Sequence, residues 1–465
     1  MNIFLNEKII NFEEHENVWI GKALDNIKIK IKLEEKQFEI LESKFADKQE
    51  TEKVLELFTE AYFNNQAEKI ESEQNGVEFE ENEISDTEQE KQPYDPESIR
   101  VDTKIFSIKY IHELLNPEEN EAVKINLTPD FQRNFVWTDI TRKSRLIESI
   151  LLRIPLPVFY FSQDIEGNFS IIDGVQRLTV INDYLNNKFV LKNLEYLKEC
   201  EGKCFKKIKN GKVDENLSLD NKYRNRMHQT QITCNVIDPQ TPSSVKFDIF
   251  RRINTGGKNL NPQEMRNCLA KPEVRNLLNS LKKSSAFLKA TDNSIKATRL
   301  DDQEIVLRFI SFYCEKKGKL LQYKGNMNKY LDDALEFLNE NIKDTQFFEK
   351  VKENFIEAMQ IAEYGYGKYA FRKIKYSDYK KNGKRSLINK SLFIAISINL
   401  SDFKFIELSS KYPKDFLLKP TLNEIESNIQ FYDALTNGTN DYQRLNLSIK
   451  TISDILIKLE ENTDD

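Results

Sequence analysis

The stretch FSIIDGVQRLTVINDYL, residues 169–185, joins two patterns of hydrophobicity at an Asp-Gly pair. The apolar run before Asp173 is typical of a buried strand, whereas the spacing of apolar residues after Gly174 is that of an amphipathic helix. A strand that enters a helix through glycine leaves backbone N–H groups at the positive end of the helix dipole. These groups favour a bound anion, and the guanidinium of Arg177 in the first turn suits a phosphate.

The same residues also allow a purely structural interpretation, in which Asp173 caps the helix and Arg177 lies at the surface. In the functional interpretation, Asp173 holds a sugar hydroxyl, a metal-bound water or a neighbouring arginine. From this stretch alone the two interpretations stay open.

Two other stretches carry residue types that suit a polyanion pocket. LTPDFQRNFVWTDITRKSRLIESI, residues 127–150, places Gln132 and Arg133 in a loop before a helix. DIFRRINTGGKNLNPQEMRN, residues 248–267, contains a Gly-rich loop whose backbone N–H groups are able to wrap a phosphate. The pocket residues of that loop are Arg252, Asn254, Thr255, Gly256 and Gly257. Each stretch alone also fits a purely structural role. The first would be a hydrophobic plug with solvated charges, and the second a tight turn between helices.

The order of patterns along the chain indicates an α+β fold followed by helices. Strand and helix patterns are mixed up to about residue 290, and amphipathic helices with short connections follow. We therefore expect an α+β domain over residues 99–290 and an all-helical domain over residues 291–465. Before them we expect a small N-terminal extension of uncertain fold, residues 1–66, and an acidic linker, residues 67–98.

The formal net charge of −6 for 465 residues conceals an acidic segment. Residues 68–97 contain 12 acidic residues and 2 lysines, a net charge of −10, so the rest of the chain carries −6 + 10 = +4. We interpret the segment as a solvated linker. The alternatives are a nucleic-acid mimic that competes for a basic groove and a segment that binds a basic partner.

Several classes of protein are disfavoured by composition. The sequence has no run of 18 apolar residues and no pattern of a signal peptide, so we expect a cytoplasmic protein without membrane association. Five cysteines at irregular spacing fit reduced thiols better than a disulfide framework. Cys200 and Cys204 do not have the spacing of a zinc knuckle, and we expect no metal held by the protein alone.

A basic and aromatic stretch, residues 364–385, reads YGYGKYAFRKIKYSDYKKNGKR and holds eight Lys or Arg, one Asp and six aromatic residues. Cations interleaved with rings suit a nucleic-acid backbone with unstacked bases. The expected DNA-contacting residues are Lys368, Arg372, Lys373, Lys375, Tyr376, Lys380 and Lys381. The alternative is a Tyr-rich loop that packs on the helices with a solvated rim. CFKKIKNGKVDENLSLDNKYRNR, residues 204–226, is a second basic loop with the same two interpretations.

Taken together, the segments PDFQR…VW, DGVQR and FRRINTGGKNLNPQEMR resemble, in this order, the N-terminal domain family of GmrSD-type modification-dependent restriction enzymes. The resemblance covers roughly residues 94–455 and implies a ParB/sulfiredoxin-like fold. It places the family's Asp-Gly-Gln-Gln-Arg signature on Asp173, Gly174, Gln176 and Arg177, with Val175 in place of the first Gln. Since valine cannot form a hydrogen bond with its side chain, hydrolysis is less well supported than binding.

The resemblance also implies what the pocket does. It implies a nucleoside triphosphate, with Mg²⁺ if the site is catalytic, in a restriction-type or DNA-surveillance protein of phage defence. A DNA phosphate in the same pocket is the alternative. The expected catalytic residues are Asp173, Gln176, Arg177 and Glu264, of which Glu264 orients an arginine or a metal. The other named loop residues, Gln132 and Arg133 among them, complete the phosphate site.

Members of the family pair this domain with an HNH nuclease, which needs histidine as general base. The three histidines here, His15, His112 and His228, lack a His-x-x-Pro setting, so we expect no HNH module in this chain. Three hypotheses remain: an NTPase or ParB-like nuclease, a non-catalytic sensor of nucleotide or modified DNA that acts with a separate nuclease subunit, and a toxin-neutralising or scaffold protein. The sequence leaves open the nucleotide, the DNA modification, the partner and the oligomeric state.

Overall fold

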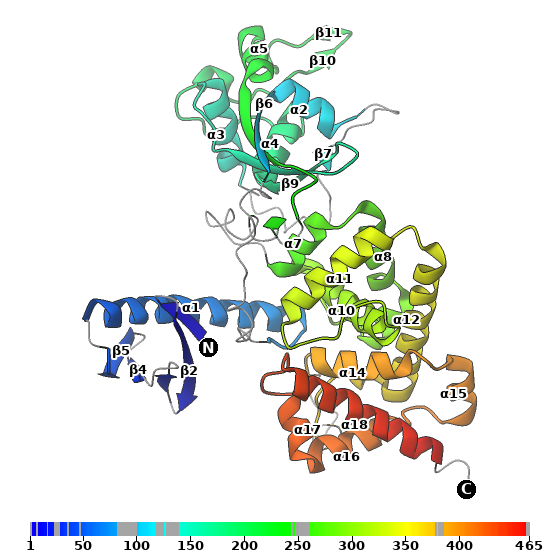
Figure 1. Ribbon diagram of the computed structural model, residues 1–465. Coiled ribbons are helices and arrows are strands. Elements are labelled where there is room, and N and C mark those ends of the chain that lie inside the picture. Colours follow the sequence, from blue (N-terminus) through cyan, green and yellow to red (C-terminus); the bar gives the residue numbers. More distant parts are fainter. Residues whose placement is uncertain are drawn as a thin grey trace. The chain divides into compact units, whose positions relative to one another are not determined.

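The structure is a computed structural model that divides into two compact units (Figure 1). One unit comprises residues 92–270, and the other combines residues 1–91 with residues 271–465. The described residues are 2–5, 8–15, 17–22, 28–34, 37–45, 48–80, 100–117, 125–126, 139–242, 245–246, 249, 261–376, 379 and 386–461. The expected fold class, mixed strands and helices followed by an all-helical C-terminal part, is confirmed.

The unit of residues 92–270 is built on a mixed sheet with the strand order β6-β12-β8-β9-β7. Its strands are β6 (Val101–Ser107), β7 (Ile125–Asn126), β8 (Phe159–Gln163), β9 (Phe169–Asp173) and β12 (Gln231–Ile237), with a separate hairpin of β10 (Ile208–Lys209) and β11 (Lys212–Val213). Its helices are α2 (Ile108–Leu115), α3 (Ile140–Leu151), α4 (Val175–Leu185), α5 (Asn221–Gln229), α7 (Pro262–Leu269) and the short 3₁₀ helix η4 (Lys198–Cys200). The hairpin of β8 and β9 and the helix after it lie where the sequence predicts them.

Alternation along the strands places one hydrophobic face of this sheet under the helices. Phe159 and Phe161 of β8 are fully buried, and Ile171 of β9 shares their cluster. Helices α2, α3, α4 and α5 supply the other half of the core, for example Ile147 and Leu178. Because strand residues two apart point to the same side, this pattern fixes the register of the sheet against the helices.

The C-terminal part of the other unit consists of helices with short connections. They are α8 (Pro272–Lys282), α9 (Ser285–Ala290), η6 (Ala297–Arg299), α10 (Asp301–Lys316), α11 (Met327–Asn341), α12 (Thr345–Tyr366), η7 (Gly367–Tyr369), α14 (Lys390–Leu400), α15 (Phe405–Lys411), α16 (Leu418–Ser427), α17 (Ile429–Ala434) and α18 (Tyr442–Glu461). Helix α10 is buried nearly all round, with Ile305, Phe309 and Ile310 inaccessible to solvent. Helices that are apolar on every side form the centre of a helical domain.

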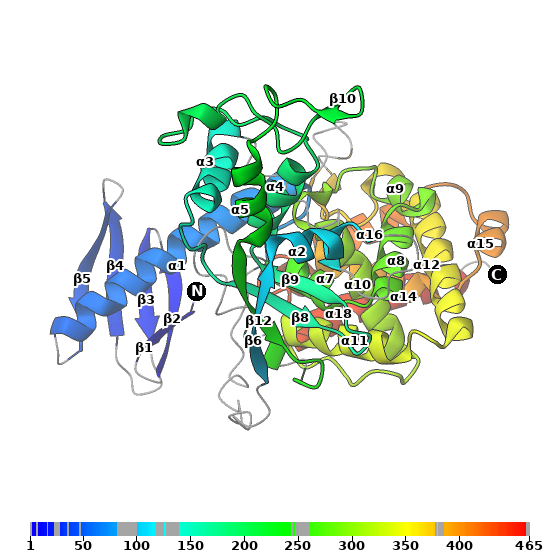
Figure 2. The same ribbon diagram turned by 90° about the horizontal axis from the view of Figure 1, so that it is seen from above.

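The N-terminal residues form an antiparallel meander with one helix across it (Figure 2). Its elements are β1 (Asn2–Leu5), β2 (Lys8–His15), β3 (Val18–Lys22), β4 (Lys28–Glu34), β5 (Gln37–Ser43) and α1 (Lys48–Asn75). Alternate strand residues, such as Trp19 and Phe38, pack against Phe58 of α1. A five-stranded meander needs such a cover, since a single sheet buries little on its own.

Part of the acidic segment differs from the expected solvated linker. Helix α1 continues to Asn75, whose side-chain amide donates to Asp301 at 2.8 Å. Beyond it Val77 is fully buried and bridges to Ile388, and the backbone N–H of Glu78 donates to the carbonyl of Ile388. Residues 75–80 thus pack into the helical unit, where the carboxylates of Glu78 and Glu80 meet the cations of Lys373 and Arg308. Residues 81–97 lie outside the described residues.

The boundary of the α+β unit lies at Ala270 rather than at residue 290. Helices α8 and α9 already belong to the helical unit, since α8 packs on α10 and α9 packs on α12. Leu277, Leu278 and Leu281 provide the apolar stripe of α8 for that contact. All five cysteines are buried free thiols, and within the described ranges no helix has the length and hydropathy required to cross a membrane.

Candidate functional site

The junction of β9 and α4 has a backbone that only glycine can form without strain. Gly174 has φ +100° and ψ 6°, in the left-handed region that residues with a Cβ avoid. A Cβ added to Gly174 would lie 2.3 Å from Cδ1 of Phe159. The residue between the predicted strand and helix is therefore glycine for two independent reasons, its dihedral angle and its contact with a buried ring.

The first turn of α4 has no side-chain cap. Gly174 is the N-cap residue, and its carbonyl accepts the first helical hydrogen bond from Leu178 at 2.9 Å. Asp173 therefore does not cap the helix, contrary to the structural interpretation of this stretch. An uncapped helix start presents N–H groups to solvent or to an anion.

Arg177 is bound to its own protein rather than displayed at the surface. Its guanidinium donates to the backbone carbonyls of Pro157 and Val158, the latter at 3.2 Å, and to Oδ2 of Asp173 at 2.9 Å. Its Cζ lies 4.2 Å from the centre of the Phe159 ring, and 13% of the side chain is exposed. Burial lowers the pKa of the guanidinium, whereas the carboxylate of Asp173 opposes this shift. Arg177 therefore ties the start of β8 to the end of β9.

Asp173 and Gln176 keep unused hydrogen-bonding capacity. The side chain of Asp173 is 41% exposed, and only its Oδ2 has a partner among the described residues. Oε1 of Gln176 is buried and has no donor in the part of the chain that the structure describes. Both residues fit contact with a further group, because buried or fixed acceptors without donors cost free energy. Cys234 lies nearby, but burial raises the pKa of its thiol to about 12, so it is no thiolate nucleophile.

Glu264 lies on α7, which packs against β9. Its carboxylate accepts from the backbone N–H of Asn261 at 2.8 Å, while its own N–H donates to Oδ1 of Asn261 at 2.7 Å. This reciprocal capping box gives Glu264 a structural role at the start of the helix. The polar residues Gln263, Arg266 and Asn267 of the same helix are also buried, which is unusual for a helix of eight residues.

The remaining predicted pocket residues belong to two loops that lie outside the described residues. Gln132 and Arg133 of the first loop lie outside the described residues. The same holds for the second loop, with Arg252, Asn254, Thr255, Gly256 and Gly257. Of the predicted catalytic and phosphate-binding residues, the structure brings Asp173, Gly174, Gln176 and Arg177 together and places Glu264 on a helix beside the same strand.

The predicted DNA-contacting stretch of the helical unit is largely internal. Arg372 is 2% exposed, and its guanidinium donates to Lys368 O, Ser386 O, Thr291 O and Ser294 Oγ. Burial lowers the pKa of Arg372 to about 10. Its contacts bind three chain segments together, so we leave Arg372 out of any nucleic-acid surface.

The neighbours of Arg372 divide into engaged and exposed groups. Nζ of Lys373 lies 3.6 Å from a carboxylate oxygen of Glu78 and donates to Thr436. The backbone N–H of Tyr376 donates to Glu426, with 2.5 Å between the atoms. Lys368 and Lys375 have exposed side chains, whereas Lys380 and Lys381 lie outside the described residues. Two of the six aromatic residues, Tyr366 and Phe371, are buried, and the other four are half-buried.

Reasoning from sequence missed the groups that hold Arg177. Two of its partners are backbone carbonyls, at Pro157 and Val158, and carbonyls leave no mark in a sequence. The ring of Phe159, which the guanidinium also contacts, appears in the sequence only as one more apolar residue of a strand. It also missed Glu148 of α3, a buried carboxylate that accepts the backbone N–H groups of Glu195, Tyr196 and Leu197.

Residues 111–271 match the family model described as GmrSD restriction endonuclease, N-terminal domain. This range includes β8, β9, α4 and α7, and therefore the whole described part of the candidate site. No curated protein and no solved structure matches the chain. The resemblance drawn from the three sequence segments is thus confirmed over residues 111–271, the part of the expected range 94–455 that matches this domain family.

Proposed function

We propose that the protein acts in restriction-type phage defence and binds a nucleoside triphosphate where β9 meets α4. The kind of domain supports the first half, because residues 111–271 match a restriction-enzyme family. One observation carries the second half. Helix α4 begins at a glycine without a side-chain cap, next to Asp173, whose Oδ2 is held by Arg177 while the side chain stays 41% exposed.

The start of α4 suits the phosphate part of such a ligand. The N–H groups of the first turn carry the positive end of the helix dipole, and Gly174 lets a ligand approach the backbone closely. A side-chain cap would occupy those groups, and Gly174 provides none. A phosphate group there satisfies the donors that the fold leaves open.

Asp173 is the group that we assign to the metal or the sugar. Arg177 donates to Oδ2 of Asp173 at 2.9 Å and so fixes the orientation of the carboxylate, while Oδ1 stays available to a ligand. An oxygen of this kind fits a water bound to Mg²⁺ or a ribose hydroxyl, and Mg²⁺ offsets the charge of the phosphates when it is bound. Arg177 accordingly acts as a positioning residue for Asp173 and does not bind the phosphate itself.

The rest of the pocket belongs to the proposal as predicted from the sequence. Gln132 and Arg133 would come from one loop, and Arg252 with residues 254–257 from the other. Gln176 would use its buried Oε1 to accept a donor from the ligand or from one of these loops. Glu264 supports the site indirectly, through the helix start that it stabilises.

A second candidate function is a sensor that binds nucleotide or modified DNA without turnover and acts with a separate nuclease. Two features favour it: Val175 offers no polar side chain at the first helical position, and the fork of Arg177 is committed to carbonyls and to Asp173. Transition-state charge on a phosphoryl group needs free donors, and these two positions supply none.

The experiment combines thermal unfolding and phosphate release with a panel of NTPs and Mg²⁺. Wild type should be stabilised by at least one NTP, since a ligand at 100 times its Kd adds about 2.7 kcal/mol. Asp173→Asn should lose that stabilisation. Its unfolding midpoint without ligand should fall, because Arg177 loses its counter-charge, but by less than in Arg177→Ala, since the amide oxygen can still accept from the guanidinium. Release of phosphate selects the NTPase, and stabilisation without release selects the sensor. If no NTP shifts the unfolding of wild type, the nucleotide site is refuted.

Val175→Gln provides the matched control variant, because it restores the family's signature at one position. In an NTPase this variant should release phosphate faster than wild type, whereas in a sensor it should change neither the release nor the fold. Arg177→Ala is expected to lower the unfolding midpoint even without ligand, since it leaves two carbonyls without donors.

A further inference from the structure

The hairpin of β10 and β11 concentrates positive charge on a short, exposed ribbon. Residues 203–213 contain five lysines and no acidic residue. Lys203 pairs with Asp220 at 2.7 Å, but the other four, at 206, 207, 209 and 212, are exposed and make no ion pair within the described part of the chain. Figure 1 shows the hairpin at the edge of its unit, beyond α5.

The register of the hairpin sets like charges opposite each other. Lys209 pairs directly with Lys212, and Ile208 pairs with Val213. The turn is formed by Asn210 and Gly211, both with positive φ, as a two-residue hairpin loop requires. Like charges at directly opposite positions destabilise a hairpin, so the packing of the fold does not explain this pair.

Three lysines share one face of the ribbon. Lys207, Lys209 and Lys212 lie on the same side because the ladder continues through the bond from Asp214 N–H to Lys207 O at 2.8 Å. Asp214, opposite Lys207, uses its carboxylate to accept the backbone N–H of Asn216. Three lysines outnumber this single carboxylate, so the face keeps a net positive charge.

The base of the hairpin is fixed to the domain core. Cys204 and Phe205 are buried, and Cys204 exchanges backbone hydrogen bonds with Leu217 and Leu219 at 2.8 and 2.9 Å. The backbone N–H of Lys207 donates to Ser218 Oγ at 2.9 Å. Binding therefore does not have to order the backbone that carries the lysines, which reduces the entropic cost.

The hairpin is connected to the candidate nucleotide site through α4. The side chain of Asn187, just after this helix, accepts the backbone N–H of Lys206 at 2.8 Å. Gly174 is the N-cap residue at the other end of α4. A helix of eleven residues spans about 16 Å. The lysines accordingly form a surface separate from the nucleotide pocket.

We propose that this lysine ribbon, defined as Lys206, Lys207, Lys209 and Lys212 on the β10–β11 hairpin, binds the phosphate backbone of duplex DNA. A two-stranded ribbon fits the major groove, where lysines at its edges meet phosphates. Residues 206–217 contain no aromatic residue to stack on unpaired bases, which favours a duplex over a single strand. DNA as the class of partner rests on the proposed function; the surface rests on the hairpin alone.

The test uses the full chain and a fluorescent 20-bp duplex, with binding followed by anisotropy at several salt concentrations. The triple variant Lys207→Gln, Lys209→Gln, Lys212→Gln should weaken binding on the order of tenfold or more. It should also reduce the slope of log K against log salt by about 2 to 3, since each phosphate contact adds about 0.9.

The matched control removes the same charge from exposed lysines of the helical unit, Lys289→Gln, Lys343→Gln and Lys350→Gln. This control should leave both the affinity and the slope close to those of wild type. The ribbon proposal is overturned if the two triple variants bind duplex DNA alike. It is equally overturned if wild type binds a polyglutamate peptide but no duplex at low salt.

Nucleotide-dependent thermal stabilisation, measured on the same proteins, separates this proposal from the preceding one. Loss of duplex binding in the ribbon variant with nucleotide stabilisation intact supports both. If the ribbon variant loses duplex binding and no NTP stabilises either protein, the ribbon proposal is supported and the proposed nucleotide site is refuted.

Discussion

Two basic regions of this chain look alike in sequence and are used in opposite ways. In the stretch of residues 368–376, Arg372 is buried under four acceptors and Lys373 is paired with Glu78. In the lysine ribbon the cations are exposed and face one another across a hairpin. In the first region, Arg372 and Lys373 are bound by acceptors within the fold. In the second region, the lysines remain exposed to solvent.

The difference lies in what surrounds each region rather than in its charge. The stretch in the helical unit alternates cations with residues such as Phe371 and Ile374, which carry the chain into the core. The ribbon has a two-residue turn and only one exposed apolar side chain, Ile208 with 62% exposure. A run of Lys and Arg therefore predicts a binding surface only where its apolar neighbours do not pull it inward.

Arg372→Ala gives the largest expected effect and tests the internal half of this comparison. The variant leaves the carbonyl of Ser386 without its donor and removes one donor from the carbonyl of Thr291, which keeps the N–H and hydroxyl of Ser294. Together with the cavity left by a side chain that is 2% exposed, this should cost about 3 kcal/mol or more of the free energy of unfolding. Chemical denaturation followed by helical circular dichroism measures it, with Lys375→Ala as the exposed control. A stable Arg372→Ala protein with weaker DNA binding would reverse the assignment of the two regions.

Glu80→Gln tests whether the acidic segment is the counterpart of the internal cations. Glu80 lies 2.6 Å from Nη2 of Arg308, both side chains are nearly inaccessible, and Glu304 and Lys390 complete the buried cluster. Loss of one charge from such a cluster should cost about 3 kcal/mol. Glu73→Gln, an exposed residue of the same segment, should be neutral in the same denaturation experiment. Equal stability of the two variants would mean that the segment is a linker after all.

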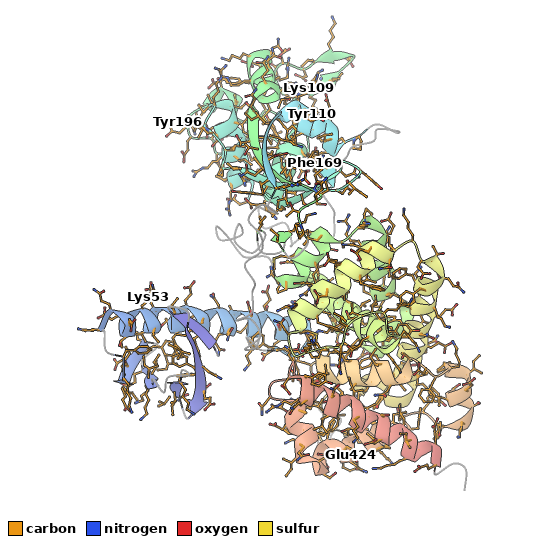
Figure 3. All side chains as sticks on the ribbon, viewed as in Figure 1. Lys53, Lys109, Tyr110, Phe169, Tyr196 and Glu424 are labelled. Carbon is orange, nitrogen blue, oxygen red and sulfur yellow. The ribbon has the colours of Figure 1, made fainter. Side chains whose placement is uncertain are left out.

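Glu148→Gln tests how firmly the loop before the ribbon is held, and the expected loss is about 2 kcal/mol. Burial raises the pKa of Glu148, but three backbone N–H bonds outweigh it and keep the pKa below the ordinary value of 4.5. The bonded loop includes Tyr196, whose ring is exposed (Figure 3). Because the folded pKa is depressed, this stabilisation is present above the unfolded pKa and is lost as pH falls through the folded pKa.

The measurement is the unfolding midpoint of wild type and Glu148→Gln between pH 7 and acid pH. The two curves should differ most near neutral pH and converge at acid pH. Parallel curves over the whole range would show that the carboxylate charge does not hold the loop.

Lys209→Glu has the smallest expected effect on stability and the opposite sign. An acid opposite Lys212 replaces repulsion by attraction and should stabilise the protein by about 0.5 kcal/mol. The same change should weaken duplex binding, so stability and affinity should move in opposite directions. If both fall together, the hairpin has merely been damaged and the ribbon has no special role.

The sequence predicts best what depends on local pattern. The strands β8 and β9, the Gly174 junction and helix α4 all follow from hydrophobic spacing and from one glycine. The contacts of Arg177 with two carbonyls and the burial of Arg372 could not be predicted, because they depend on segments that meet only in the folded chain. Residues 68–80 were the hardest case, since an acidic composition is the same for a solvated segment and for one with buried partners.

The pairing of residues 75–80 with the helical unit affects the order in which the chain can fold during translation. Asn75 meets Asp301, 226 positions later, and Glu80 meets Arg308, 228 positions later. The early segment therefore leaves the ribosome long before its partners exist, and the whole α+β unit is synthesised in between. Since such distant contacts form slowly, the helical unit should complete its core only near the end of synthesis. A nascent chain stopped at residue 300 should accordingly remain sensitive to protease in residues 75–80.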